Sequence, residues 1–403
     1  MTGGVRSRLL KLAPVVTGLV LFAASCASNA PQDTFKPEGP AARKIDNLIV
    51  PIFGVAGIVF VLIIGGAIFI AWKFRARDDD DYNEMPKQVH GHFKAEIGWT
   101  IAPALVLLVV GALTVNLIFE LAKKPSKEAV HVEVYGQQWW WEYRYDLNGD
   151  GDYTDIITAN DLVIPAGREV ALRIRSRDVI HSWWAPRLNG KKDAVPGRVH
   201  PLTIEADKPG EYIGQCTEFC GLSHAEMRIK VVAVTDSEYE AWTKHQQEPF
   251  QKPTTQAAIN GWGAFAGQCT MCHELTGMID PTSADDPRDA TEKYAFPKEK
   301  MQVSGEAPNL LHFMTRSTFA GAKFDLRKDT PECNKLGTTW ASTDEGIAKC
   351  LNRTDLESWL RNPPSMKAMH PGDTPSPESR GMPNLDLSED QIDDLVAFLT
   401  TLK

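Results

Sequence analysis

Two thiols, an imidazole and a thioether lie close together in one segment of the sequence, at Cys216, Cys220, His224 and Met227. Thiolate and thioether sulfur atoms select copper, zinc or iron–sulfur chemistry, and imidazole suits copper and zinc. Two cysteines four residues apart on one loop can aim both sulfur atoms at one point, where each thiolate could bridge two metal ions. The spacing therefore predicts a metal centre in which each of two ions also needs its own histidine.

The second histidine must come from another part of the chain, and His181 is the candidate. The thioether of Met227 would be a weak ligand to one metal, and the backbone carbonyl of Glu218 would serve the other. Two other readings of the same segment are open. The two thiols could form a disulfide if the domain lies outside the cytoplasm, or they could hold structural zinc together with the two histidines. A thioether is a poor ligand for zinc, which counts against the zinc site.

A second group of chemically active residues is Cys269-Thr270-Met271-Cys272-His273. Cys-x-x-Cys-His is the attachment motif of a c-type haem, in which two thiols bond the haem covalently and the histidine becomes an axial ligand. A thioredoxin-like or zinc-binding pair is the alternative. A haem that only transfers electrons takes a methionine as its other axial ligand. Met366, Met369 and Met382 are the candidates for this ligand.

The composition limits the class of protein. The chain has 403 residues, enough for two or three domains. Its formal net charge of −9 argues against non-specific binding of nucleic acid, whereas an acidic surface could steer a basic protein partner. Of the seven cysteines, four fall in the two close pairs, a pattern typical of metal or cofactor chemistry rather than of a disulfide scaffold.

The N-terminal part of the chain predicts export and membrane attachment. Residues 1–25 combine basic residues with a short apolar run, which is typical of a signal peptide. Cys26 follows small residues and would be the lipidated first residue of a lipoprotein; ordinary cleavage nearby is the alternative. Residues 26–44 are expected to be a linker, and residues 45–122 a hairpin of two membrane-spanning helices. The basic residues Lys73, Arg75 and Arg77 mark the cytoplasmic end, so both termini lie outside.

The remainder of the chain predicts two domains outside the membrane. Alternating apolar segments separated by Gly and Pro over residues 128–235 indicate an antiparallel β-sandwich. Residues 236–255 are polar and are expected to be a flexible linker that leaves the following domain mobile. Residues 256–403 predict a helical domain, whose last helix begins with a capping box at Ser388 and Gln391. Its Cys333 and Cys350 are expected either to form a disulfide or to be free thiols.

The pattern Cys-x-Glu-x-Cys-x3-His-x2-Met, with His-Ser-Trp upstream, closely resembles the dinuclear copper (CuA) site of cytochrome c oxidase subunit II. The resemblance covers roughly residues 40–235 and implies a cupredoxin fold. It also implies that Trp139, the first of three consecutive tryptophans, is the residue at which electrons enter, although packing alone could explain the aromatic run. In the family, the side chain of Glu218 would contact Mg²⁺ at the interface with subunit I. Glu96 would lie at a proton-channel entrance, or it could simply mark the start of a helix.

The C-terminal segment around Met382 resembles class I cytochromes c, in which the ligand methionine lies just before the last helix. The resemblance implies that Met382 is the second axial ligand of the haem, with Met369 as the second choice. Together the resemblances imply subunit II of a haem–copper oxidase with its own cytochrome c domain, in a bacterial plasma membrane and with both metal domains on the outer face. Electrons would pass from haem c to CuA and then to haem a of subunit I, where O2 reduction is coupled to proton translocation. The expected partners are subunits I and III and, as electron donor, cytochrome c or a quinol–cytochrome c reductase. The alternatives are a stand-alone membrane-tethered carrier and a copper-delivery or redox-sensing protein.

Overall fold

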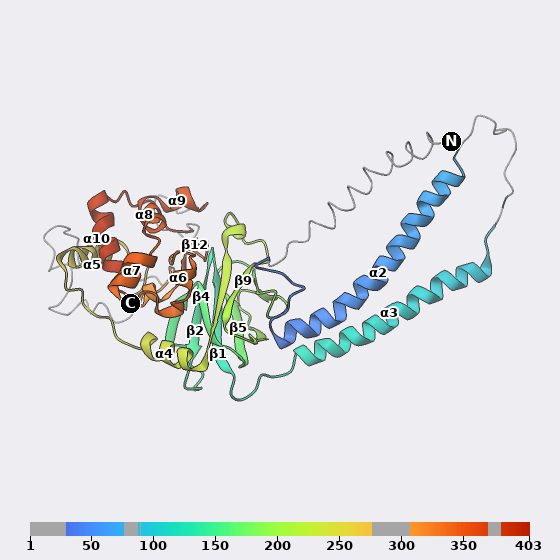
Figure 1. Ribbon diagram of the computed structural model, residues 1–403, viewed down its shortest axis with the longest axis horizontal. Helices are drawn as coiled ribbons and strands as arrows, with labels where there is room; N and C mark the ends of the chain where they lie inside the picture. Colours follow the sequence, from blue (N-terminus) through green and yellow to red (C-terminus); the bar gives the residue numbers. More distant parts are fainter. Residues whose placement is uncertain (1–29, 76–87, 89, 276–306, 370–379) are drawn as a thin grey trace, which may run out of the picture.

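The computed structural model of the chain describes residues 30–75, 88, 90–275, 307–369 and 380–403. Figure 1 shows two long helices at one end, a β-sandwich in the middle and a mainly helical C-terminal domain at the other end. The predicted signal peptide and Cys26 lie outside the described residues.

The two long helices run side by side away from the sandwich (Figure 1). They are α2 (Pro40–Lys73) and α3 (Phe93–Leu121), and both are long and apolar enough to cross a membrane. None of the side chains in their most apolar stretches is buried within the described chain, so these faces need lipid or partner helices. A 2.6 Å ion pair between Lys44 and Glu120 joins their outer ends. Helix α2 begins within the predicted linker 26–44, because proline suits the first turn of a helix.

The middle domain is a sandwich of two five-stranded sheets with the strand orders β3-β2-β1-β5-β8 and β4-β10-β9-β6-β7. The first sheet contains β1 (Val130–Gln137), β2 (Trp140–Asp146), β3 (Ile156–Ala159), β5 (Val170–Ser176) and β8 (His200–Ile204). The second contains β4 (Asp161–Pro165), β6 (His181–Trp184), β7 (Lys192–Ala194), β9 (Gly210–Cys216) and β10 (Arg228–Val234). The predicted sandwich is therefore present, although β1 pairs with β5, and β4 with β10, in parallel.

Aromatic side chains of β2 fill the space between the two sheets. Trp141, Tyr143 and Tyr145 alternate along the strand and are fully buried. The hydroxyl of Tyr145 donates to the carbonyl of Val163 at 2.9 Å and accepts from the amide of the same residue at 3.0 Å, which links the sheets. Each such side chain contributes roughly 1.5–3 kcal/mol through burial, so the sandwich is a rigid support for the loops at its ends.

The connection after the sandwich is shorter than predicted. Residues 236–255 were expected to be a linker, but α4 (Asp236–Gln246) forms at their start behind a capping box of Thr235 and Glu238. Tyr239 and Trp242, three residues apart, are buried against the sandwich, and Trp242 packs on Tyr145 at a ring distance of 5.3 Å. Because most residues around these two aromatics are polar, the sequence did not indicate an amphipathic helix here. The connection between the two domains is therefore limited to residues 247–255.

The C-terminal domain has its centre where α5 (Gln256–Gln268) crosses α10 (Glu389–Leu399). The helices approach so closely at Gly261 that an added Cβ would lie 1.9 Å from the carbonyl oxygen of Asp394. The predicted capping box of Ser388 and Gln391 is confirmed at the start of α10. The other elements are α6 (Pro331–Asn334), α7 (Asp344–Cys350), α8 (Arg353–Arg361), α9 (Pro363–Met366) and a small hairpin of β11 (Thr318–Phe319) and β12 (Phe324–Asp325).

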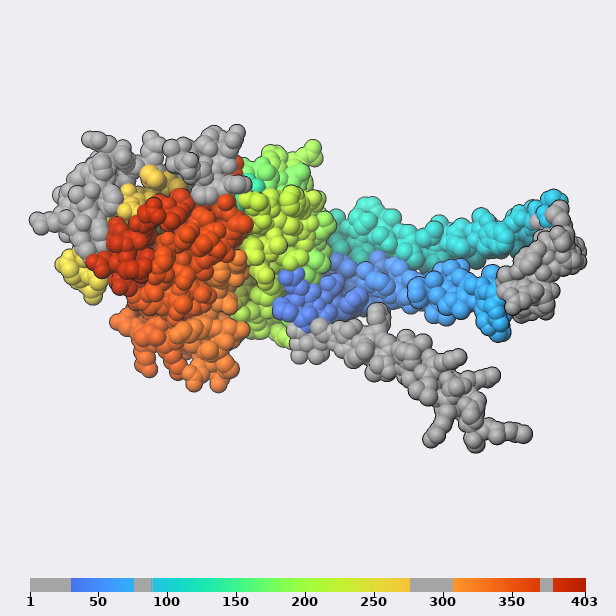
Figure 2. Space-filling model, turned by 90° about the horizontal axis from the view of Figure 1, so that it is seen from above, coloured from blue at the N-terminus to red at the C-terminus, as the bar shows by residue number. Residues whose placement is uncertain are grey.

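A disulfide between Cys333 in α6 and Cys350 at the end of α7 closes part of the C-terminal domain. The domain as a whole lies directly against the sandwich, as Figure 2 shows for one face of the molecule. The amide and hydroxyl of Ser317 both donate to the buried carboxylate of Asp161 at 2.6 Å. This packed interface differs from the mobile domain that the polar linker predicted, since long-range hydrogen bonds hold it in place.

Candidate metal centres and their surroundings

Strands β6, β9 and β10 bring the predicted metal ligands of the sandwich together. Cys216 is the last residue of β9 and Met227 directly precedes β10, so the loop between them carries the other ligands. The amide of Cys216 donates to the carbonyl of Met227 at 2.9 Å and closes the base of this loop. His181 begins β6, in which Trp183 pairs with Cys216. The sheet therefore places His181 beside the loop.

The sulfur atoms of Cys216 and Cys220 are 3.8 Å apart, and both cysteines are buried and free. On one side, the sulfur of Cys216 lies 3.9 Å from Nδ1 of His181 and 3.3 Å from the carbonyl oxygen of Glu218. His181 comes from strand β6 and Glu218 from the loop after β9, and both lie on the Cys216 side of the thiol pair.

On the other side, the sulfur of Cys220 lies 3.5 Å from Nδ1 of His224 and 3.9 Å from the sulfur of Met227. The ligand atoms of His181, Cys216 and Cys220 all lie within 4.8 Å of one another. Each sulfur atom thus has one imidazole and one weaker donor beside it, an arrangement that matches two metal ions sharing two thiolates.

Asp178 fixes the orientation of His181, a role that the sequence analysis did not assign. Its Oδ1 is 2.8 Å from Nε2 of the imidazole, and its carboxylate also accepts from the amides of Gln138 and Val179. Burial lowers the pKa of His181, but the hydrogen bonds and charges of Asp178 and Cys216 together outweigh it and raise that pKa. With Nε2 held by the carboxylate, Nδ1 faces the thiols as a metal ligand should. The Asp-x-x-His spacing was the available signal.

The contact between the two thiols shifts their pKa values in opposite directions. The hydrogen bond from Cys220 lowers the pKa of Cys216 to about 4 against the opposing effect of burial, and His181 contributes in the same direction. The same contact raises the pKa of Cys220. Since the thiolate is the metal-binding form, one sulfur is ready to bind, and a cation would displace the remaining proton.

The donor set decides between the readings of this site. A disulfide is absent, and a single tetrahedral zinc would use two thiolates and two imidazoles and leave the thioether of Met227 unused. Thioether beside thiolate and imidazole suits copper. The residues therefore fit a dinuclear copper centre better than structural zinc.

Trp139 lies directly against the loop that carries the thiols. Its indole Nε1 donates to the carbonyl of Cys220 at 2.9 Å, and the side chain of Gln138 donates to the same oxygen at 2.7 Å. An added Cβ on Gly221 would lie 3.2 Å from the indole ring. Trp139 is 4% exposed, and its backbone carbonyl accepts a hydrogen bond from Lys367 of the C-terminal domain at 2.8 Å. It therefore lies between the loop and that domain.

The Cys-x-x-Cys-His segment follows α5, whose C-terminal cap is Cys269. The amides of Cys272 and His273 both donate to the carbonyl of Cys269, so the segment forms one tight turn. Nδ1 of His273 lies 2.9 Å from the carbonyl of Pro308, and among the described residues its Nε2 has no partner. A histidine held in this way presents Nε2 to a metal.

The sequence analysis did not identify Arg316 as a site residue. Its burial and its hydrogen-bond donors bear on whether a haem fits in this domain. It is 2% exposed, and its Nη2 donates to the carbonyl of Asn309. Its Nε and Nη1 have no partner within the described part of the chain. A buried guanidinium with free donors suits a carboxylate ligand, and a haem carries two propionates. The arginine is close enough to His273 to lower the pKa of that imidazole, together with the larger effect of burial.

The two candidate methionines pack against different cores. Met382 is partly buried against the hydrophobic core of the C-terminal domain, which contains Cys269. Met369 packs against the core of the sandwich. Their contacts favour Met382 as the ligand of a group held by the C-terminal domain.

Glu96 lies in the first turn of α3. Its carboxylate accepts from the amide of His92, the residue that caps this helix, at 3.0 Å. This contact supports the simpler reading, in which the glutamate stabilises a helix start.

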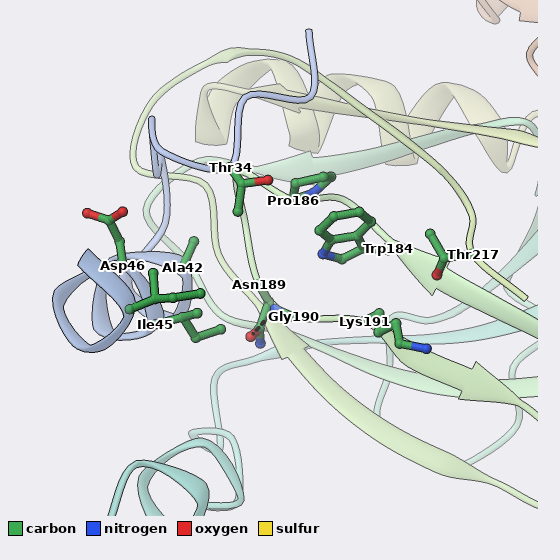
Figure 3. Close-up of a pocket in the computed structure, with 11 residues that line it drawn as sticks. Thr34, Ala42, Ile45, Asp46, Trp184, Pro186, Asn189, Gly190, Lys191 and Thr217 are labelled. Carbon is green, nitrogen blue, oxygen red and sulfur yellow. Dashed lines mark hydrogen bonds between the residues drawn. The ribbon is translucent and has the colours of Figure 1, made fainter. Parts of the chain in front are cut away.

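A groove between helix α2 and the sandwich is separate from the metal ligands. It has a volume of about 330 Å³, with Trp184 and Pro186 facing Ile45 (Figure 3). Thr217 borders it, and the hydroxyl of that residue is buried with no partner among the described residues. Its apolar lining is typical of a surface covered in a membrane complex.

Comparison with known proteins places the chain in a family. Residues 130–234 match the family described as cytochrome c oxidase subunit II, periplasmic domain, and residues 32–117 match its transmembrane domain. Cytochrome c oxidase subunit 2 of Alkalihalophilus pseudofirmus is 30% identical over 393 residues, which cover 96% of this chain and 95% of that protein. The corresponding subunit of Bacillus sp. (strain PS3) is 31% identical over 345 residues, or 82% and 80% of the two chains.

Among solved structures, the periplasmic domain of cytochrome oxidase subunit II of Bradyrhizobium japonicum is 29% identical to this chain. The match covers 31% of this chain and 97% of that one, with a TM-score of 0.28. The assignment of the chain to a family rests on the two family matches and the nearly full-length relative, and not on this structural match. The chain therefore belongs to the cytochrome c oxidase subunit II family, whose members are membrane-bound subunits of a haem–copper oxidase with an outer-face domain.

Proposed function

We propose that this chain takes up electrons in a fused C-terminal cytochrome c domain, passes them through the copper domain and delivers them to haem a of subunit I. When bound, the copper pair and the covalent haem would supply reversible one-electron chemistry. Oxygen reduction and the coupled proton translocation would take place on subunit I. The chain would lie in a bacterial plasma membrane with subunits I and III as partners, and cytochrome c or a quinol–cytochrome c reductase would be its donor.

The observation that carries the copper part is the convergence of four further donors on two cysteine sulfur atoms that are 3.8 Å apart. His181, Cys216, Cys220, His224 and Met227 would hold the metal by their side chains and Glu218 by its carbonyl. Asp178 would keep His181 in the ligating tautomer. The side chain of Glu218 is partly exposed and would contact Mg²⁺ at the interface with subunit I. Glu96, in the first turn of α3 at the cytoplasmic end of the hairpin, would lie at the entrance of a proton channel in subunit I.

Two features of the C-terminal domain support the haem. Cys269 and Cys272 would bond it covalently, and His273 and Met382 would be its axial ligands. The orphaned donors of Arg316 fit a propionate. The match to the relative from A. pseudofirmus covers 96% of the chain and so extends into this domain, although it gives no evidence about the haem.

Trp139 would be the residue through which electrons reach the copper pair. Its indole is hydrogen-bonded to Cys220, and its carbonyl to a residue of the C-terminal domain. It thus has direct contacts on both sides of the proposed transfer. Cys26 would carry a lipid that adds a second membrane attachment.

The copper centre is tested by electron paramagnetic resonance on the purified oxidase. Two bridged coppers that share one unpaired electron should give hyperfine structure from two equivalent nuclei, and His181→Ala should abolish it. His131→Ala, in the same sandwich but away from the loop, is the matched control. A single-copper hyperfine pattern in fully loaded protein would contradict the proposal.

The haem is tested by denaturing electrophoresis, which removes any haem that is not covalently bound. This chain should retain haem, and Cys269→Ala with Cys272→Ala should lose it, whereas replacement of the disulfide pair Cys333 and Cys350 should not. Co-purification of a many-span haem subunit separates an oxidase subunit from a stand-alone carrier.

A further inference from the structure

A lysine of the C-terminal domain is buried at the interface with the copper domain. Lys367 is 3% exposed. Its Nζ lies 2.8 Å from the carbonyl oxygen of Trp139, 2.8 Å from that of Ala320 and 3.3 Å from that of Glu226. An ammonium group has three donors and no acceptor, so three carbonyls satisfy it completely. Two of them belong to the copper domain.

The chain around Ala320 is shaped for this contact. Gly321 adopts a φ of +74°, and an added Cβ would lie 2.3 Å from the carbonyl oxygen of Trp139 and 2.6 Å from Nζ of Lys367. Its amide donates to the side chain of Asn160 at 3.1 Å, and its carbonyl accepts from the amide of Arg228 at 2.9 Å. Only a residue without a side chain lets the two domains approach so closely here.

The contacts on either side of the lysine lead to the two proposed redox sites. On the copper side, Trp139 and Gln138 both hydrogen-bond to the carbonyl of Cys220. On the other side, Arg380, two residues before Met382, lies with its Nε 3.1 Å from Oε1 of Gln138. The side chain of Gln138 therefore contacts both the thiol loop and the segment that carries Met382.

We propose that Lys367 is a positioning residue for electron transfer, which holds the C-terminal domain at one fixed place over Trp139. This inference rests on the proposed function, because it needs a redox group in each domain. The lysine itself would carry no electron; it would set the distance between the groups. Removing its donors leaves up to three buried carbonyls unsatisfied in the docked arrangement, while the undocked arrangement exposes them to water. The docked fraction should therefore fall.

The test uses the complete oxidase with Lys367→Met, which removes the three donors and keeps an unbranched chain of similar length. Lys335→Met changes an exposed lysine of the same domain and is the matched control. The first readout is hydrogen exchange at the amides of Ser317 and Gly321, whose bonds to Asp161 and Asn160 cross the interface. The second is the rate of electron transfer from the C-terminal haem to copper after rapid reduction.

In Lys367→Met we expect exchange at these amides to accelerate and the transfer rate to fall, each roughly tenfold or more, for the loss of one or two net hydrogen bonds. The optical spectrum of the haem and the resonance of the copper should be unchanged. If the variant does not accumulate, Gly321→Ala takes its place, since it separates the domains by steric contact and keeps the lysine.

An unchanged transfer rate, with or without faster exchange, would overturn the positioning role. A slower rate with unchanged exchange would overturn it as well, because the lysine would then act without fastening the domains. Failure of the proposed function is distinguishable, since copper or covalent haem would then be missing from the unmodified oxidase before any variant is measured.

Discussion

Replacing Arg316 by methionine should change the stability of the C-terminal domain in opposite directions with and without haem. Burial lowers the pKa of Arg316 to about 10, with Asp161 opposing the shift. Such a shift corresponds to a free-energy cost of about 3 kcal/mol for keeping the guanidinium charged in its buried position. Methionine removes this cost and the hydrogen bond to Asn309, worth about 1 kcal/mol, so the haem-free domain should gain about 2 kcal/mol.

In the protein with bound haem, Arg316→Met should instead destabilise the C-terminal domain. A propionate that accepts from the free Nε and Nη1 of Arg316 makes charge-assisted hydrogen bonds, each worth roughly 1.5–3 kcal/mol. Arg316→Met would leave that carboxylate buried without its donors, and the domain should lose about 2–4 kcal/mol. The reduction potential should also fall, because a positive charge near the iron favours the reduced state.

Hydrogen exchange of the α5 and α10 amides reports the stability of this domain separately from that of the sandwich. The haem-free form is obtained with Cys269→Ser and Cys272→Ser. Arg353→Met is the matched control, since this exposed arginine pairs with Glu357 and Asp393 at the surface and should change either form by less than about 0.5 kcal/mol. If Arg316→Met destabilises both forms alike, the guanidinium is a packing residue and the haem argument built on it fails.

Four further predictions follow from single contacts. Met382→Ala should abolish the weak near-infrared sulfur-to-iron absorption and lower the haem potential, and the ligand assignment is wrong if Met369→Ala does so instead. Burial raises the pKa of Glu211, but Lys230 and Arg327 outweigh it and hold that pKa below its ordinary value. Above about pH 4.5, the Ser317 amide should therefore be better protected from hydrogen exchange in the unmodified protein than in the Glu211→Gln variant. This difference in protection should vanish as the pH falls through the lowered pKa of Glu211, and a difference that persists in acid would refute the prediction. Replacing Cys333 and Cys350 by alanine should cost about 3 kcal/mol for a loop of this length, and dithiothreitol should weaken only the unmodified protein. Trp139→Phe should slow haem-to-copper transfer while both metal spectra stay unchanged; an unchanged rate would leave Trp139 as packing.

Local patterns in the sequence predicted those parts of the molecule that short segments determine. The thiol loop could be identified because four of the proposed side-chain ligands lie between Cys216 and Met227, and a hairpin between β9 and β10 brings them together. The capping box at Ser388 was equally local. Even His181, from another strand, was identified by its His-Ser-Trp context.

The features that the sequence did not predict depend on residues far apart in the chain. Lys367 meets Trp139 across a separation of 228 residues, and Ser317 meets Asp161 across 156. No periodicity or motif links such pairs. Likewise, the sequence predicted a linker where α4 forms. Tyr239 and Trp242 stand among polar residues, and their burial depends on the sandwich, including Tyr145, which lies far away in the sequence.

The fixed interface bears on how a fused donor domain would work. A flexible tether raises the effective concentration of a donor but leaves it to search for its docking position. Here α4 is packed on the sandwich, and residues 247–255 connect it to a domain already held by Asp161, Asn160 and Glu211. Gly321 and Lys367 contact the backbone of Trp139 from that domain. A soluble donor would have to displace this domain to reach Trp139, so electrons from outside would enter through the C-terminal domain, and the copper centre would exchange them with a single attached donor.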